Sequence, residues 1–259
     1  MGLPTATAKK LLCECGVIDP IQMPIEIIVR SKNIILKEED IGGSDGRILI
    51  HGDMAVITIN SNISFEAKKR FTIAHELGHY LLHREKTKLF NDDEISLTHW
   101  YYSNYGKEEM EANEFASELL MPSNLFSEEC KGKIFDPRVI DYLAQRFQVS
   151  KTAAILKFVE SGNYPVCVIY CSDKKMRWWK RSKDFRCYLK FESNQSPPTG
   201  SVASELFNSG TVYYGGNRKQ DIFKSVWFDL DRDEQDKTMY EYCLHAISHN
   251  YTLSVIWED

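Results

Sequence analysis

The feature that most constrains the fold is the sequence His-Glu-Leu-Gly-His, residues 75–79, which lies within a predicted helix over residues 66–83. Residues four apart lie on one face of a helix, so the imidazoles of His75 and His79 can bind the same metal ion. Glu76 lies about 100° further round the helix axis. Its carboxylate can therefore reach a water molecule that the metal activates, without occupying a ligand position. The motif predicts a hydrolytic metal centre with Glu76 as the base. The alternative is a surface helix whose two histidines bind no metal.

A catalytic zinc ion needs a third protein ligand, because such sites have three protein ligands and one open position. The longer pattern H-E-x-x-H-x-x-G-x-x-H does not supply it, since Leu82 and Glu85 occupy the places of its glycine and last histidine. His83 lies one further turn along, but three ligands in a row on one straight helix cannot close a tetrahedron. We therefore interpret His83 as a packing histidine at the end of the helix.

The second long predicted helix, residues 107–121, offers the missing ligand. Five of its residues follow helical spacing and could share an inward face: Glu109, Ala112, Asn113, Ala116 and Leu120. On this face Glu109 is the expected third ligand, and Asn113 is the expected hydrogen-bond partner of a ligating histidine. Glu108 and Glu111 are rivals for the ligand position. All three carboxylates could instead be solvated charges that favour the helix N-terminus.

The sequences RFTIAHELGHYLLH (residues 70–83) and EMEANEFASELLMP (residues 109–122) together resemble the ImmA/IrrE family of metallopeptidases, over roughly residues 5–160. The resemblance implies a thermolysin-like site in which His75, His79 and Glu109 bind zinc. It also implies that Glu76 is the general base, and manganese would suit the same ligands. Arg70 matches an arginine that often stands just before the family's active helix, without an assigned role.

Members of this family typically cleave a helix-turn-helix repressor, which relieves repression of a mobile element or a stress regulon. The resemblance therefore implies a zinc-dependent endopeptidase whose partner is a helix-turn-helix transcriptional repressor. The alternative function is a DNA-binding or scaffolding regulator with a vestigial or structural metal site. A zinc hydrolase that does not cleave proteins is a further alternative, because the motif does not name the scissile bond.

The expected fold is α+β, arranged in three segments. Residues 1–130 form a thermolysin-like zinc peptidase core with a small sheet and the active-site helices. Residues 131–163 resemble the helix-turn-helix-like segment that follows this core in the family. Residues 164–259 form a β-rich α+β C-terminal domain, which resembles more distantly the GAF-like region of the radiation-response branch and would be regulatory.

Local patterns predict the individual elements. A helix is expected at residues 5–17, the β-branched segments 25–30 and 34–37 are typical of strands, and Gly42, Gly43 and Gly46 mark a turn. A strand pair is expected within residues 48–60, and its second strand could lie at a sheet edge and pair with an extended substrate. The remaining expectations are two helices within residues 137–160, strands at 166–171, 176–180, 187–192, 211–216 and 225–230, a helix at about 236–249 and a final strand at 252–257.

The net charge of −5 argues against a surface that binds nucleic acid strongly. Two basic clusters nevertheless occur, at residues 131–160 and 174–186. The apolar residues of the first could equally form core. In the second, Trp178 and Trp179 could stack on a single strand, but a strand with one buried aromatic face is the favoured interpretation. Direct nucleic-acid binding is therefore not favoured.

Seven cysteines, odd in number and irregular in spacing, predict no disulfide framework. No apolar run approaches the roughly 18 residues that would span a bilayer. We therefore expect a cytoplasmic protein without a membrane partner. Four residues are candidates for stabilising an oxyanion, but no geometric argument selects one of them: Tyr80, His99, Tyr101 and Tyr102.

Overall fold

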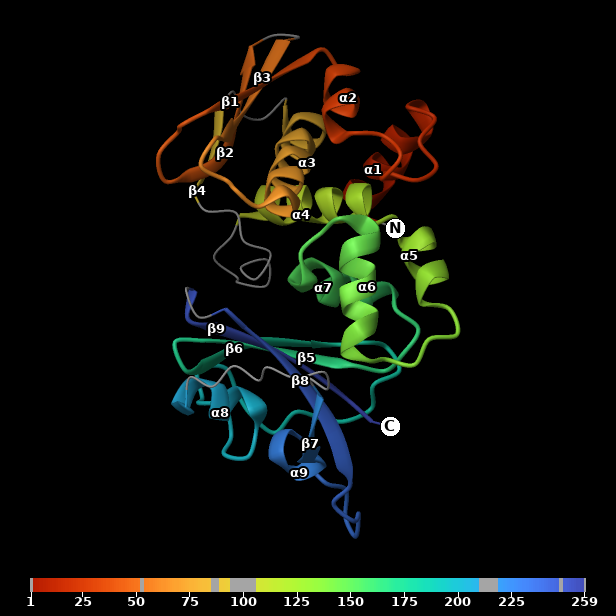
Figure 1. The fold of residues 1–259 in the computed structure, drawn as a ribbon, viewed down its shortest axis with the longest axis vertical. Coiled ribbons are helices and arrows are strands. Elements are labelled where there is room, and N and C mark those ends of the chain that lie inside the picture. The colour runs from red at the N-terminus through yellow and green to blue at the C-terminus, as the bar shows by residue number, and fades with distance from the viewer. Residues whose placement is uncertain are drawn as a thin grey trace. The chain divides into compact units, whose positions relative to one another are not determined.

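The computed structural model describes residues 2–51, 54–84, 106–209, 219–246 and 249–258, together with the backbone of residues 89–93. The chain divides into two compact units, Met1–Glu129 with Leu143–Ala153, and Cys130–Tyr142 with Ala154–Asp259 (Figure 1). Helices and two separate sheets confirm the α+β class. The boundaries between the units fall within three helices, and the three-segment arrangement expected from the sequence stays a prediction.

The first unit combines a small sheet with helices. Its helices are α1 (Leu3–Glu14), α2 (Ile25–Arg30), α3 (Glu66–His83), α4 (Lys107–Leu120) and α5 (Ser123–Cys130), and it shares α6 (Pro137–Phe147) and α7 (Lys151–Ser161) with the second unit. Its strands are β1 (Ile34–Glu39), β2 (Ser44–His51), β3 (Met54–Asn60) and β4 (Leu89–Asp93). In the described residues the strand order is β1-β3-β2-β4, with β1 parallel to β3 and the other pairs antiparallel. Helix α3 packs against β2, β3 and α4.

Two expectations about strands in this unit are wrong. The segment Ile25–Arg30 is a helix, because Ile25, Ile28 and Val29 are buried at the spacing of one helical face. Strand β3 is not at an edge, since β1 pairs with one side of it and β2 with the other. An extended substrate therefore cannot pair with β3. The expected helices over residues 66–83 and 107–121 and the strand pair within residues 48–60 are confirmed as α3, α4 and β2–β3.

The second unit is built on an antiparallel sheet with the order β6-β5-β9-β8-β7 in the residues described. Its strands are β5 (Cys167–Ser172), β6 (Lys175–Arg181), β7 (Lys219–Phe223), β8 (Thr238–Ala246) and β9 (Tyr251–Trp257), and two short helices accompany them, α8 (Val202–Ser209) and α9 (Lys224–Trp227). One face of the sheet packs on a core that includes Ile169, Trp227 and Ile256.

The helix expected at about residues 236–249 is wrong, because this segment forms β8. It is hydrogen-bonded to β7 on one side and β9 on the other, so pairing with strands distant in sequence decides its conformation. Of the other expected strands, residues 187–192 contribute a single bridge from Leu189 to Phe228, and residues 225–230 begin inside α9. The strand expected at residues 211–216 lies outside the described residues.

A buried carboxylate joins the helices of this unit to its sheet. Glu241 on β8 accepts hydrogen bonds from the backbone N–H groups of Val202 and Ala203, at 2.9 and 3.2 Å, where α8 begins. It also accepts bonds from Trp227 Nε1, at 3.1 Å, and Ser254 Oγ, at 2.6 Å. Four donors surround this carboxylate, so we assign it a structural function.

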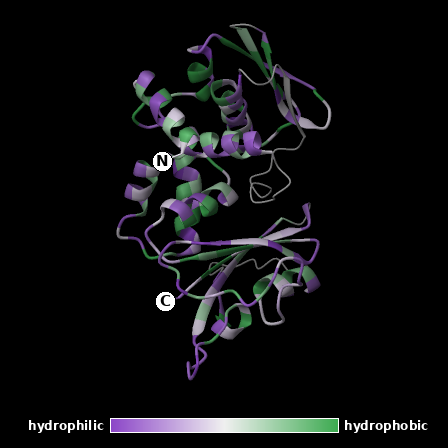
Figure 2. Ribbon diagram, turned by 180° about the vertical axis from the view of Figure 1, so that it is seen from behind, coloured by the Kyte–Doolittle hydropathy of each residue, from purple (hydrophilic) through white to green (hydrophobic). Residues whose placement is uncertain are grey.

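The helices of the first unit carry both hydrophobic and hydrophilic residues, as the mixed colours of Figure 2 show. Helix α3 is buried on all sides along Arg70–Tyr80, so its polar residues lie inside the unit. None of the helices in the described residues has the length and hydropathy that a membrane span requires.

Candidate metal centre

The two histidines of α3 and one carboxylate of α4 form the cluster at the centre of the first unit. His75 Nε2 and His79 Nε2 lie 3.0 Å apart, and both rings are fully buried. Glu109 approaches them with one oxygen each: Oε2 is 3.2 Å from His75 Nε2, and Oε1 is 3.3 Å from His79 Nε2. Within the described residues these three side chains are the group whose ligand atoms are close enough to share a metal ion.

The spacing of these atoms fits a tetrahedral ion. Zinc–nitrogen and zinc–oxygen bonds of about 2.0–2.1 Å place the ligand atoms of a regular tetrahedron about 3.3–3.4 Å apart. The two imidazole nitrogens are 3.0 Å apart, and each lies 3.2 or 3.3 Å from a different oxygen of Glu109, separations close to such an edge. With one ligand atom taken from each residue, the three atoms lie within 4.8 Å of one another. Two imidazoles and one carboxylate also leave one position open, which is the donor set of a catalytic rather than a structural zinc site.

Close packing of α3 on α4 makes the cluster possible. A Cβ atom at Gly78 would lie 3.2 Å from the Cα and carbonyl oxygen of Ala112 and 3.0 Å from Phe115 Cδ1. Glycine therefore lets the two helix backbones approach closely. Glu109 stands one turn before Ala112 on α4, so this approach brings its carboxylate to the two histidines.

Asn113 orients the first histidine. Its Oδ1 atom lies 2.8 Å from His75 Nδ1, and the side chain is buried. An amide oxygen can only accept, so His75 Nδ1 carries the hydrogen. The lone pair of a neutral His75 ring is then on Nε2, the atom that faces Glu109 and His79.

The Glu109 carboxylate is held in its charged form. Burial raises the pKa of Glu109, but the His75 and His79 rings, when protonated, donate hydrogen bonds and positive charge that outweigh burial and hold the pKa well below the ordinary glutamate value. The rival Glu111 lies elsewhere, with Oε2 at 2.9 Å from His83 Nε2. The structure thus brings Glu109, rather than Glu111, to the two histidines of the motif.

Glu76 is fully buried against strand β2. A Cβ atom at Gly46 would lie 2.7 Å from Glu76 Oε1 and 2.5 Å from Thr72 Cγ2. Gly46 therefore provides the space that the carboxylate occupies. The sequence placed Gly46 in a turn, but it belongs to β2, and only the position of α3 shows what its missing side chain does.

Arg70 joins the start of this helix to the end of α6. Its Nη1 atom donates to the carbonyl oxygens of Phe147, at 3.0 Å, and Gln148, at 2.9 Å. Gln148 has a φ of 51°, the left-handed conformation in which helices commonly end. Arg70 thus satisfies carbonyl groups that the helix end leaves without intrahelical partners. This is a structural function for a residue that sequence patterns could not assign.

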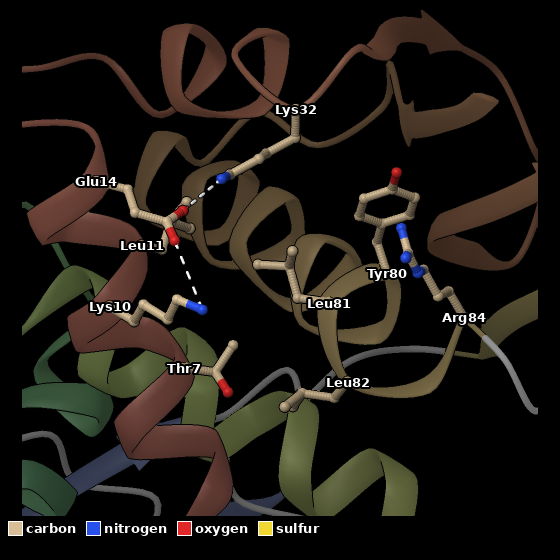
Figure 3. Close-up of a pocket in the computed structure, with 9 residues that line it drawn as sticks. All are labelled: Thr7, Lys10, Leu11, Glu14, Lys32, Tyr80, Leu81, Leu82 and Arg84. Carbon is tan, nitrogen blue, oxygen red and sulfur yellow. Dashed lines mark hydrogen bonds and ion pairs between the residues drawn. The ribbon is translucent and has the colours of Figure 1, made fainter. Parts of the chain in front are cut away.

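A separate cavity of about 660 Å³ lies between α1 and the last turns of α3 (Figure 3). Glu14 forms ion pairs there with Lys32, at 2.7 Å, and Lys10, at 3.8 Å. Tyr80, one of the oxyanion candidates, lines this cavity beside Arg84. The cavity lining contains no residue of the metal cluster. The other oxyanion candidates, His99, Tyr101 and Tyr102, lie outside the described residues.

The basic cluster at residues 131–160 is partly neutralised. Arg146 pairs with Asp19, at 2.7 Å, and Glu129, at 2.8 Å, while Arg138 pairs with Asp136, at 2.8 Å. The apolar residues named with this cluster are buried, as a core function requires: Leu143, Phe147, Ala153, Ile155, Leu156 and Phe158.

The second basic cluster, residues 174–186, includes strand β6. Trp178 is buried and stacks on Tyr170, with ring centroids 5.1 Å apart, while Trp179 on the other face is 40% exposed. This alternation matches the strand with one buried aromatic face.

The site therefore has the arrangement of a hydrolytic metal centre: two histidines of an H-E-x-x-H helix, a carboxylate from a second helix, and a buried glutamate beside the first histidine. A family model described as the IrrE N-terminal-like domain, of the M78 peptidases, matches residues 29–158. This match covers half of the chain, and the chain belongs to the ImmA/IrrE family.

Two metalloproteases from Deinococcus species are similar in sequence to this chain. The radiation response metalloprotease IrrE of Deinococcus radiodurans is 34% identical over 125 residues, which are 46% of this chain and 35% of that protein. The protein of the same name from Deinococcus deserti is 36% identical over 122 residues, 45% of this chain and 40% of that protein. The matches thus span between a third and two fifths of the length of these relatives.

A solved structure shares the fold. It is described as a Mycobacterium tuberculosis transcriptional regulator, and it aligns with a TM-score of 0.62 at 15% identity, covering 100% of this chain and 77% of that one. At this identity the likeness concerns the fold alone.

Proposed function

We propose that the chain is a zinc-dependent endopeptidase with a thermolysin-like centre, and that its substrate is a helix-turn-helix transcriptional repressor. The observation that carries the proposal is the convergence of His75, His79 and Glu109, whose ligand atoms lie within 4.8 Å of one another. Family membership supports a metallopeptidase, and the names of the two Deinococcus relatives agree with it. The repressor substrate rests on the family resemblance.

His75 and His79 would hold the ion through their Nε2 atoms and Glu109 through its carboxylate. When bound, zinc supplies a Lewis acid that polarises a peptide carbonyl and lowers the pKa of water. Manganese would suit the same three side chains.

Glu76 would move the proton. As water attacks the carbonyl carbon of the scissile bond, a carboxylate oxygen of Glu76 takes a proton from it and then gives one to the departing amine nitrogen. The space at Gly46 fixes where this carboxylate lies. Glu76 can perform this function without being a ligand, because the proposed ligand atoms belong to His75, His79 and Glu109.

An extended substrate would reach the site at β4. This strand is the outer neighbour of β2 in the described part of the sheet, and its Asp92 pairs with Gly46. A peptide that added to β4 would lie about 4.8 Å beyond it, two strand spacings from the strand that faces Glu76.

The proposal is tested by comparing new protein N-termini in native-host cells that express either the wild type or Glu76→Gln. The substitution retains the three proposed ligands and removes the base. The proposal expects cleavage of a helix-turn-helix repressor in wild-type cells only. Identical N-termini in both, under inducing and non-inducing conditions, would instead favour a DNA-binding or scaffolding regulator with a vestigial metal site.

A further inference from the structure

The ring of His79 makes a second contact on the side that faces away from the cluster. Its Nδ1 atom lies 3.1 Å from Nδ1 of His83, one turn further along α3. The other ring nitrogen of His83, Nε2, lies 2.9 Å from Oε2 of Glu111 on α4. The His83 side chain is 1% exposed and that of Glu111 is 20% exposed. Glu111, His83 and His79 thus form a continuous chain of hydrogen bonds that ends at the cluster.

The donor and acceptor of each of these hydrogen bonds follow from the Glu111 carboxylate, which can only accept. An ionised carboxylate only accepts, so the bond to Glu111 requires the hydrogen on His83 Nε2. A neutral imidazole has one donor and one acceptor, which makes His83 Nδ1 the acceptor. His79 Nδ1 must then donate. The lone pair of His79 is consequently on Nε2, which faces His75 and Glu109.

His75 and His79 therefore have the same tautomer, with hydrogen on Nδ1, but different partners hold them in it. Asn113 fixes His75 directly through an amide oxygen, at 2.8 Å. His79 is instead in contact with His83, and the tautomer of His83 depends on its bond to the Glu111 carboxylate. Outer partners of this kind orient metal-ligating imidazoles and raise their basicity.

We infer that His83 and Glu111 are positioning residues that hold His79 with its hydrogen on Nδ1 and its Nε2 lone pair directed at the metal position. This inference rests on the proposed metal centre and deepens it. It assigns a function to two residues that the sequence presented differently, one as a packing histidine and the other as a rival ligand.

Zinc affinity is the first test, measured for purified full-length protein by competition with a chromophoric chelator. His83→Phe keeps an aromatic ring but removes the acceptor, and Glu111→Leu removes the carboxylate at a partly exposed position. Each is expected to weaken zinc binding about 10- to 100-fold. His83→Gln, whose amide oxygen can accept from His79 Nδ1, is expected to retain most of the affinity. Glu108→Leu, the same substitution in the same turn of α4, is the matched control and should bind as the wild type does.

The second test reads the tautomer directly. In metal-free protein, nitrogen-15 NMR of the histidine side chains should show His79 with its hydrogen on Nδ1. In Glu111→Leu a substantial population with the hydrogen on Nε2 should appear, even where overall folding is unchanged. A merely structural contact would not move this signal.

The results separate this inference from the proposed function. If His75→Ala abolishes zinc binding while His83→Phe and Glu111→Leu bind zinc like the wild type, the inference is overturned and the metal centre stands. If His75→Ala itself binds zinc with wild-type affinity, the metal centre is wrong, and with it the basis of the inference.

Discussion

Replacing Gly78 by alanine tests whether helix packing builds the metal centre. The added Cβ would lie 3.2 Å from Ala112 Cα and 3.0 Å from Phe115 Cδ1, whereas carbon atoms in good contact lie about 3.5–4.0 Å apart. Helices α3 and α4 must then separate by roughly half an ångström. Glu109 moves with α4 while the histidines stay on α3, and a shift of this size exceeds the tolerance of about 0.2 Å on zinc–ligand distances.

Two opposing effects determine the stability of this variant. Alanine in a helix interior is about 1 kcal/mol more favourable than glycine. Overpacking a close contact costs about 1–3 kcal/mol. We expect a net loss of about 1 kcal/mol in the free energy of unfolding, and zinc binding weakened at least about tenfold.

Chemical denaturation and zinc titration of Gly78→Ala measure both quantities. The control is Gly43→Ala, because a Cβ there has no neighbour within 4 Å and the backbone does not need glycine. Gly43→Ala should leave zinc binding unchanged. A Gly78→Ala protein that gains stability and binds zinc like the wild type would refute the close approach of the two helices.

Three further substitutions give distinct expectations. Gly46→Ala should displace the Glu76 carboxylate and lower kcat about 100-fold at unchanged zinc affinity; loss of zinc instead would contradict this assignment. Arg70→Met should lower the free energy of unfolding by about 2 kcal/mol, as expected for charge-assisted bonds to two carbonyl groups, and a neutral result in urea denaturation would exclude that function. Burial raises the pKa of Asp19, but the bond to Arg146 outweighs it and the net pKa is below the ordinary value. This pair therefore stabilises above about pH 4 and less as the pH falls further, so thermal melts of Asp19→Asn should decline less steeply in acid than those of the wild type.

The sequence predicted the elements that carry the motif more successfully than the elements around them. Helix α3 spans the residues expected for it, Glu66–His83. The segment that forms strand β8 was expected to be a helix. Pairing with β7 and β9 decides its conformation, and those partners lie elsewhere in the chain.

The proposed third ligand, Glu109, shows how much of the site helical spacing can predict. Helical spacing placed Glu109 and Asn113 on an inward face, and the structure brings both to His75. The same spacing could not show that Glu111 points at His83, because that contact depends on the crossing of two helices 28 residues apart in sequence at this point. The function of Gly46 could not be predicted for a similar reason, because the side chains that occupy the space beside it, Thr72 and Glu76, belong to α3.

The central claim is that His75, His79 and Glu109 together bind the catalytic metal. Anomalous diffraction at the zinc edge, from crystals of the protein with one equivalent of zinc, tests it most directly. The account predicts one strong peak at about 2.0–2.1 Å from Nε2 of both histidines and from the Glu109 carboxylate. A peak bound by Glu111, or one that does not include both histidines, would contradict it.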